Sequence, residues 1–286
     1  MLEAYFGSDK EVLRFCEYLF GKSNQIQLHW KLHEEWGNHI QIEENIPSKQ
    51  LKELMANAMA HVFMENRLGN MIRSTIKKYY YYRDTDEIER IYEIANWIIT
   101  GEDDSSIQIR KTKKDEPSQL LVSLFIANMK STRIFHYDSI IKFGLGVFKD
   151  YLIHYIGLAI DEFKREEDHQ EFVNMLRNYI SKKQPKIPMI HILQGSHFTF
   201  YKESGKMFSA LELRTIMQNE PLYIVGLDED EMNLAPLIAM SPQQIKIYGD
   251  DPSEAKTLTV INVFQERVTF ESANHFPFQY YYKNEQ

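Results

Sequence analysis

The chain has 286 residues, of which 43% are hydrophobic and 26% charged, a composition typical of a folded globular protein. Its formal net charge of −8 argues against a general nucleic-acid-binding protein. The charge is uneven, because residues 187–286 carry 7 Lys and Arg against 13 Asp and Glu. The part before residue 187 is therefore near neutral, and it has room for a local basic surface.

A single cysteine, Cys16, excludes an intramolecular disulfide and a cysteine-based zinc site. The N-terminal residues lack the basic segment and apolar run of a secretory signal. The longest apolar stretch, residues 143–163, is interrupted by Lys149, Asp150 and His154, which disfavours a membrane span. We therefore expect a cytoplasmic protein with no membrane span.

The N-terminal 46 residues predict a β-α-β-β unit. Leu2–Phe6 has the pattern of a short strand, and Lys10–Phe20 places its apolar residues on one helical face. Apolar and polar residues then alternate over 26–32 and resume at 40–42, which predicts two half-buried strands. For both strands to face the same core, their turn needs an odd number of residues, and Trp36–Asn38 fits.

Helical periodicity dominates from Pro47 to about Lys183. The predicted helices cover, in chain order, residues 48–82, 86–101, 120–129, 141–163 and 170–180. The charged segment 102–117 is predicted to be a linker between the second and third of these helices.

Strands and helices alternate in the remainder of the chain. The predicted strands cover residues 189–193, 198–201, 222–226, 244–249 and 267–270, the first two forming a hairpin. The predicted helices cover residues 211–217, 234–240 and 253–265, with Asn233 as N-cap of the second and Asp251 as N-cap of the third. Strand, helix and strand at this spacing are typical of a small parallel sheet.

These patterns predict an α+β fold in three parts. They are an N-terminal β-α-β-β unit over 1–46, a helical domain over 47–186 and a C-terminal α/β domain over 187–286 with a mostly parallel sheet. Because two or three strands need another layer to pack against, we expect the first part to dock on the helical middle or to join the C-terminal sheet.

Short motifs in the second half of the chain have a familiar pattern. They are IKFGL at 141–145, DYL at 150–152, DEF at 161–163, EFV at 171–173, LRNY at 176–179, LIAMSPQQI at 237–245 and VFQERV at 263–268. With these motifs the chain resembles the YtxC-like putative sporulation proteins of endospore-forming Bacillota. The resemblance implies a link to sporulation, but it supplies no catalytic signature. Some relatives carry cysteines where this chain has Ser272–His275, so the resemblance implies no metal role there.

Acidic residues follow two of the predicted C-terminal strands. Asp228 and Asp230 follow the strand predicted at 222–226, and Asp250 and Asp251 follow the next. Open α/β sheets bind ligands at the carboxyl ends of their strands, and clustered carboxylates there are suited to Mg²⁺ and phosphoryl chemistry. The alternative is that these residues cap helices and interact with the positive end of the helix dipole.

A basic face is predicted on the first long helix. Arg73, Lys77 and Lys78 share one side of that helix, where they form a candidate contact for nucleic acid. Because the whole chain is acidic, we expect nucleic acid not to be its main partner.

Two functional hypotheses follow from the sequence. The first is a sporulation-associated interaction or regulatory protein that binds another protein or itself and has no cofactor; 17 Tyr and 12 Met suit adaptable binding surfaces. The alternative is a divalent-metal-dependent enzyme that transfers a phosphoryl group or hydrolyses a phosphate ester at the acidic edge. Whether the chain is an enzyme stays open, with the interaction protein favoured.

Overall fold

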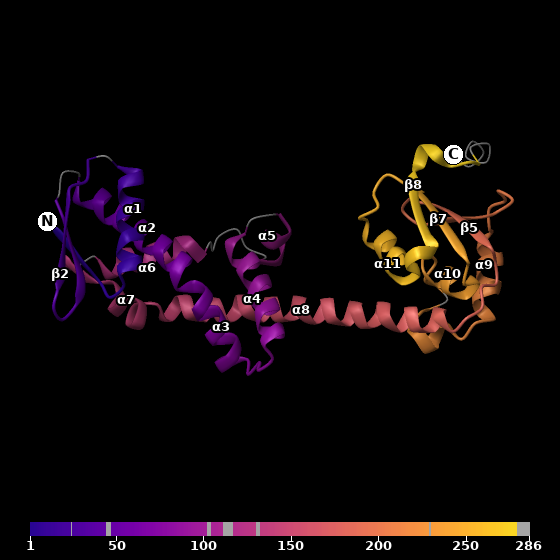
Figure 1. The fold of residues 1–286 in the computed structure, drawn as a ribbon, viewed down its shortest axis with the longest axis horizontal. Coiled ribbons are helices and arrows are strands. Elements are labelled where there is room, and N and C mark those ends of the chain that lie inside the picture. Colours follow the sequence, from indigo (N-terminus) through magenta and orange to yellow (C-terminus); the bar gives the residue numbers. More distant parts are fainter. Residues whose placement is uncertain are drawn as a thin grey trace. The chain divides into compact units, whose positions relative to one another are not determined.

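The structure is a computed structural model that describes residues 1–23, 25–43, 47–101, 104–110, 117–129, 132–228 and 230–278. The chain forms two compact units, Met1–Arg165 and Glu166–Gln286 (Figure 1). Helices and strands are mixed as predicted, with N-terminal strands, a helical middle and a small C-terminal sheet. The α+β prediction is therefore confirmed, whereas the three-part division at residues 46 and 186 stays a prediction.

The first unit begins with the predicted β-α-β-β arrangement. Its elements are β1 (Leu2–Phe6), α1 (Asp9–Lys22), β2 (Leu28–His33) and β3 (Gly37–Ile42). The strands have the order β2-β3-β1-β4, where β4 (Ile134–His136) runs parallel to β1 and the other neighbours are antiparallel. The sequence analysis missed β4, because three residues are too few to show an alternating pattern.

The turn between β2 and β3 lies two residues before its predicted place. The pairing of His33 with Gly37 leaves Glu34, Glu35 and Trp36 as the turn. Gly37 has φ +73°, and a Cβ at this position would lie 2.8 Å from the carbonyl oxygen of Phe6, so glycine is needed here. The turn still has an odd number of residues, which puts Leu32 on the same face as Ile42 as expected.

Within the described residues, seven helices follow the first three strands. They are α2 (Ser48–Asn66), α3 (Leu68–Tyr79), α4 (Thr85–Thr100), α5 (Asp104–Arg110), α6 (Pro117–Asn128), α7 (Tyr137–Gly144) and α8 (Gly146–Ser181). Several predicted boundaries were wrong here. The first long helix breaks at Arg67, and the predicted linker contains α5. The helix predicted at 141–163 breaks at Leu145, between α7 and α8, and its remainder continues through the helix predicted at 170–180 as the single helix α8. The residues that join them, 164–169, contain neither Gly nor Pro to end a helix.

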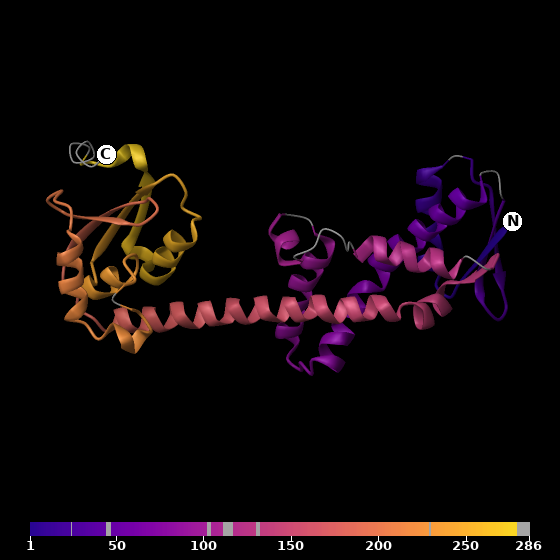
Figure 2. The same ribbon diagram turned by 180° about the vertical axis from the view of Figure 1, so that it is seen from behind.

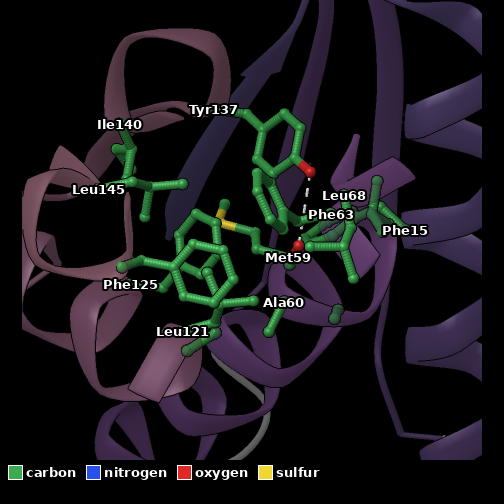
Figure 3. Close-up of a cluster of buried hydrophobic side chains, with 14 of the residues drawn as sticks. Phe15, Met59, Ala60, Phe63, Leu68, Leu121, Phe125, Tyr137, Ile140 and Leu145 are labelled. Carbon is green, nitrogen blue, oxygen red and sulfur yellow. Dashed lines mark hydrogen bonds between the residues drawn. The ribbon is translucent and has the colours of Figure 1, made fainter. Parts of the chain in front are cut away.

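Strands and helices of the first unit share one hydrophobic core. It includes Phe6 and Ile40 of the sheet, Phe15 of α1, Met59 of α2 and Phe148 of α8. The N-terminal strands therefore dock on the helical middle, as expected. Figure 3 shows part of this core, in which the buried Tyr137 hydroxyl donates a hydrogen bond to the carbonyl oxygen of Met59 at 3.5 Å. Burial raises the pKa of Tyr137 well above its usual value.

A buried carboxylate binds the arginine at the break between α2 and α3. Glu11 of α1 is 3% exposed, and both its oxygens accept hydrogen bonds from the guanidinium of Arg67, which raises the pKa of Arg67. Arg67 also donates to Asp138 of α7 at 2.8 Å, and the other oxygen of Asp138 accepts the backbone N–H of Gly7 at 2.8 Å. We call Glu11, Arg67 and Asp138 the ion triad; it links β1, α1, α7 and the α2–α3 junction.

The second unit is built on a four-stranded sheet. Its elements are β5 (Met189–Leu193), β6 (Thr199–Lys202), α9 (Ala210–Gln218), α10 (Ala235–Met240), β7 (Gln244–Gly249), α11 (Ala255–Phe264) and β8 (Val268–Ser272). The strand order is β6-β5-β7-β8, with β5, β7 and β8 parallel and β6 antiparallel (Figures 1 and 2). The mostly parallel C-terminal sheet is confirmed.

Each face of this second sheet has its own apolar cover. Ile190, Ile192, Ile245 and Ile247 point to the face that packs with the helices of this unit. The opposite face carries His191, Tyr201 and Tyr248, which pack with Phe276 and Phe278 from the C-terminal segment. The His191 Nδ1 lies 3.0 Å from the Tyr248 hydroxyl, and burial lowers the pKa of His191.

The prediction of a strand at residues 222–226 was wrong. Leu222–Val225 is a 3₁₀ helix, labelled η1, whose Leu222 and Val225 are buried while the two residues between them face solvent. Pro221 precedes it, and Gly226 ends it with φ +65°. A four-residue apolar run does not distinguish a strand from a short helix, and here the proline and glycine decide it.

The ion triad predicts a measurable coupling between Glu11 and Arg67. Arg67→Met leaves a buried carboxylate without its cation and is expected to lower the free energy of unfolding by about 3 kcal/mol at pH 7. Adding Glu11→Gln to that variant should restore part of the loss, because the uncompensated charge disappears. Denaturant unfolding of the two single variants and the double variant measures this coupling.

Unfolding measured over a series of pH values tests whether the charge of Glu11 causes the loss of stability in Arg67→Met. The cost of leaving a buried carboxyl group unpaired depends on its negative charge, so we expect the loss to be smaller in acid than at pH 7. Arg14→Met, which removes an exposed pair with Glu17, is the matched control and should cost no more than about 0.5 kcal/mol. A loss for Arg67→Met that is equally small would contradict the proposed coupling.

Candidate functional site

The carboxyl edge of β5 and β7 is organised by one glutamine. Gln194 follows β5, and its Oε1 accepts the backbone N–H groups of Asp250 and Asp251 at 3.0 and 3.1 Å, just after β7. Its Nε2 lies 2.6 to 2.8 Å from the Asp251 carbonyl oxygen, a Glu254 carboxylate oxygen and the Thr257 hydroxyl, which share its two N–H donors. The amide therefore fixes the β7–α11 loop through both of its ends.

Gly249 permits this arrangement. A Cβ at this position would overlap the side chain of Gln194, so the close approach of β7 to the amide requires glycine. Lys256 adds a second link across the edge, because its ammonium group donates to the carbonyl oxygens of Gly195 and Ser196. The two predicted carboxylates at this edge thus belong to a loop with many internal partners.

Asp251 stabilises the turn before α11. Its Oδ1 accepts the Ser253 backbone N–H at 2.8 Å and the Ser253 hydroxyl, and these hydrogen bonds lower the pKa of Asp251. The helix itself begins at Ala255 with Glu254 as N-cap residue, so the prediction that Asp251 is the N-cap was wrong. The proline at 252 lies in the turn that precedes the helix.

Asp228 and Asp230 lie after η1, not after a parallel strand. Asp228 accepts the backbone N–H of Asp230 at 3.3 Å, and Asp230 lies 3.9 Å from Arg214 of α9. The next acid, Glu231, accepts the backbone N–H groups of residues 233, 234 and 235 and so caps α10. The prediction gave this role to Asn233, whose side chain instead accepts the N–H of Phe198.

Of the four residues predicted to bind Mg²⁺, Asp228, Asp230 and Asp251 therefore have local partners for their carboxylates. Asp250 and Asp251 lie at the Gln194 edge, and Asp228 and Asp230 line a hollow with Glu220 and Tyr223. Among the described residues, which leave out Glu229, no three carboxylate, imidazole or thiol groups form a set that would hold a metal ion. The magnesium interpretation stays a prediction that titration with the ion must test.

The predicted basic face combines one paired and two exposed cations. Arg73 donates two hydrogen bonds of 2.7 Å to Glu89 of α4, and its guanidinium lies 3.6 Å from the ring centroid of Tyr92. These contacts join α3 to α4 and raise the pKa of Arg73. Lys77 and Lys78 are exposed in the last turn of α3. A role for these residues in nucleic-acid contact stays a prediction.

Sequence reasoning missed a second group of residues, at η1. Tyr223 and Ile224 are 80% and 58% exposed, and a wrong strand assignment concealed them. Close by in sequence, Glu220 is nearly buried and forms ion pairs with Lys183 and Lys186. The signal available in the sequence was Pro221 and Gly226, which flank η1 as they often flank a turn.

Within the residues described, no single helix has the length and apolar character needed to cross a membrane. Helices α7 and α8 meet that test only as a pair, and the chain bends by 63° between them. Apolar residues of both helices, including Ile140, Leu152 and Ile156, belong to the core of the first unit.

Comparison with known proteins places the chain in a family. The model of the YtxC-like family matches residues 53–269. The chain belongs to the YtxC-like family. It is also similar to the uncharacterized protein YtxC of Bacillus subtilis (strain 168). The two sequences are 29% identical over 273 residues, and the alignment covers 94% of this chain and 93% of the relative. No solved structure matches the chain. The family resemblance seen in the sequence is thereby confirmed.

The hydrogen bonds of Gln194 predict that this YtxC-like protein loses stability when the side-chain amide is replaced by a carboxyl group. Gln194→Glu replaces a donor with an oxygen that faces the Asp251 carbonyl and the Glu254 carboxylate, so we expect a loss of about 2 kcal/mol at pH 7. The introduced carboxyl has a raised pKa in the folded state, so the loss shrinks as the pH falls towards 4. Thermal unfolding measures it, with the exposed Gln243→Glu as control; equal effects would contradict the assigned hydrogen bonds.

Substitutions of Asp251 distinguish the interpretation that it stabilises a turn from the interpretation that it binds Mg²⁺. As a turn acceptor, Asp251 tolerates Asn with little change, whereas Asp251→Ala should cost about 1 kcal/mol because the acceptor is lost. A magnesium site predicts instead that Mg²⁺ raises the melting temperature of the wild type and that both substitutions abolish the rise. Thermal melting with and without millimolar Mg²⁺ or Mn²⁺ distinguishes them, and a wild type that does not respond would contradict the magnesium site.

Proposed function

We propose that the chain is a cytoplasmic, sporulation-associated protein that acts by binding another protein and not by catalysis. The link to sporulation comes from the resemblance of its motifs to a family described as putative sporulation proteins. The interaction role is argued from the second unit, where the exposed apolar side chains of η1 form a defined surface. We call Tyr223 and Ile224 the η1 tip.

The η1 tip is rigidly presented. The N–H of Ile224 donates to the Pro221 carbonyl at 3.1 Å, and the N–H of Gly226 donates to the Tyr223 carbonyl at 3.2 Å. Leu222 and Val225 anchor the turn in the core of the second unit. An apolar side chain held by a short, anchored turn loses little conformational freedom on binding, which favours affinity.

A hollow borders the tip on each side. One is lined by Ile224 and Val225 of η1 with Met175, Tyr179 and polar residues of α8. The other is lined by Tyr223 with Glu220, Asp228 and Asp230. An exposed aromatic residue between a hollow of mixed apolar and polar lining and an acidic one is typical of a binding surface for a protein segment that carries aliphatic and basic side chains.

The single observation that carries this proposal is the 80% exposure of Tyr223 on an anchored turn. A large aromatic side chain in that position contributes little to the stability of its own fold. The free energy of transferring it out of water is therefore available to a partner. In this view the carboxylates at 228 and 230 provide charge complementarity to that partner.

Affinity purification of tagged full-length protein from sporulating and from vegetative cells tests the proposal. We expect a protein whose recovery from sporulating cells falls at least about tenfold when Tyr223→Ser and Ile224→Ser are combined. Leu211→Ser is the matched control, because Leu211 is 75% exposed on α9. Unchanged melting temperatures show that folding is intact. If no recovered protein depends on the η1 tip, the proposal is wrong.

A further inference from the structure

Strand β2 leaves one edge of the first sheet open. In the described part of the chain, β2 pairs with β3 on one side and with no strand on the other. The Glu43 N–H donates to the Gln27 carbonyl at 3.0 Å, which fixes the alternation of hydrogen-bonded pairs along the hairpin. Residues 29 and 31 therefore direct their backbone groups to β3, and residues 28, 30 and 32 direct theirs outwards.

The same outward residues carry an exposed apolar surface. Trp30 and Leu32 are 43% and 80% exposed, although their face of the sheet is the one that forms the core in β1 and β3. The Trp30 indole N–H donates to Asn38 at 2.9 Å, and Asn38 donates to Asp9 of α1 at 2.8 Å. These bonds hold the ring in place, so the edge presents a pre-organised aromatic anchor.

Helix α1 extends this surface. Leu13 lies one turn after Asp9 and on the same flank of α1, and it is 48% exposed. An exposed apolar strand edge is a template for a further strand, and folded proteins usually block such edges with charge, proline or a bulge. Here Lys31 is the charged residue within β2, and it points to the opposite face of the sheet.

We propose that a second copy of this chain covers the β2 edge, through antiparallel pairing of the two β2 strands about a two-fold axis at Trp30. The outward residues Leu28, Trp30 and Leu32 read almost the same in both directions. With Trp30 opposite its own copy, Leu28 of each copy faces Leu32 of the other, and all three positions form hydrogen-bonded pairs.

The charges on the two copies are complementary in this register. Lys31 of one copy comes opposite His29 of the other, and the Nε2 of that histidine lies 3.5 Å from a Glu43 carboxylate oxygen. This contact directs the Lys31 ammonium group of one copy towards the His29–Glu43 pair of the other, so the two-fold arrangement gains from electrostatic complementarity.

This register predicts a specific pattern of disulfide cross-linking. Residues 29 and 31 of opposite copies form a non-hydrogen-bonded pair, with Cα atoms about 4.5 Å apart, a distance that a disulfide spans. A mixture of the His29→Cys and Lys31→Cys chains should therefore give a covalent heterodimer under mild oxidation. Each variant alone should cross-link far less, and the native Cys16 is buried in the core.

Sedimentation equilibrium of the full chain between about 1 and 200 µM gives the independent measure. We expect a reversible dimer whose Kd rises at least about tenfold in Leu32→Lys and stays unchanged in Leu211→Lys, which alters an equally exposed leucine of the second unit. A monomer at all concentrations, a dimer indifferent to Leu32→Lys, or cross-linking that ignores the 29–31 register would each overturn the proposal. None of these outcomes bears on the η1 tip, which is tested separately.

Discussion

Glu11 places a carboxylate in the core of the first unit, where it is 3% exposed, and the neighbouring structure is arranged to compensate its charge. The compensation comes from Arg67, whose two hydrogen bonds to Glu11 position it at the junction of two helices. Because the desolvation of a charge is costly unless it is paired and hydrogen-bonded, this contact constrains where α2 ends and α3 begins.

The constraint reaches further through Asp138. This residue follows β4 by two positions, accepts a hydrogen bond from Arg67 and accepts another from the backbone of Gly7 at the end of β1. The parallel pairing of β4 with β1 and the start of α7 are therefore tied to the same ion triad. Strands and helices in the first unit form one core because their polar contacts and their apolar contacts connect the same elements.

The elements that the sequence predicted well are those whose pattern is local. Alternation over β2 and β3, helical spacing in α1 and α4, and the hairpin of β5 and β6 follow from neighbouring residues. Arg67, at the break, forms its hydrogen bonds with Glu11, which lies 56 residues away in the chain, so a periodicity analysis of residues 48–82 has no access to this contact. η1 and β4 are too short for a periodic signal, and α8 continues because nothing between residues 164 and 169 stops it.

The candidate sites also include features that local sequence predicts and features that depend on contacts between distant segments. The position of Asp250 and Asp251 at the end of β7 follows from the strand pattern, and the structure places them there. The role of Gln194 depends on β5 and β7 being neighbours in space, and the role of Trp30 depends on β2 being an edge strand. Neither of these spatial relations can be predicted from a single segment of the sequence. Apolar residues in a predicted strand are read as core, which is why Trp30 and Leu32 were not recognised as a surface.

Amide hydrogen exchange on the full chain tests the central claim, that the N-terminal sheet and the helices of the first unit are one cooperative structure. The account predicts that the amides of β1 and β3 and those in the middle of α2 exchange with the same opening free energy. It also predicts that a denaturant series shifts them together. Sheet amides that open well before those of α2, with a separate dependence on denaturant, would show that the strands are an independent appendage and would contradict the account.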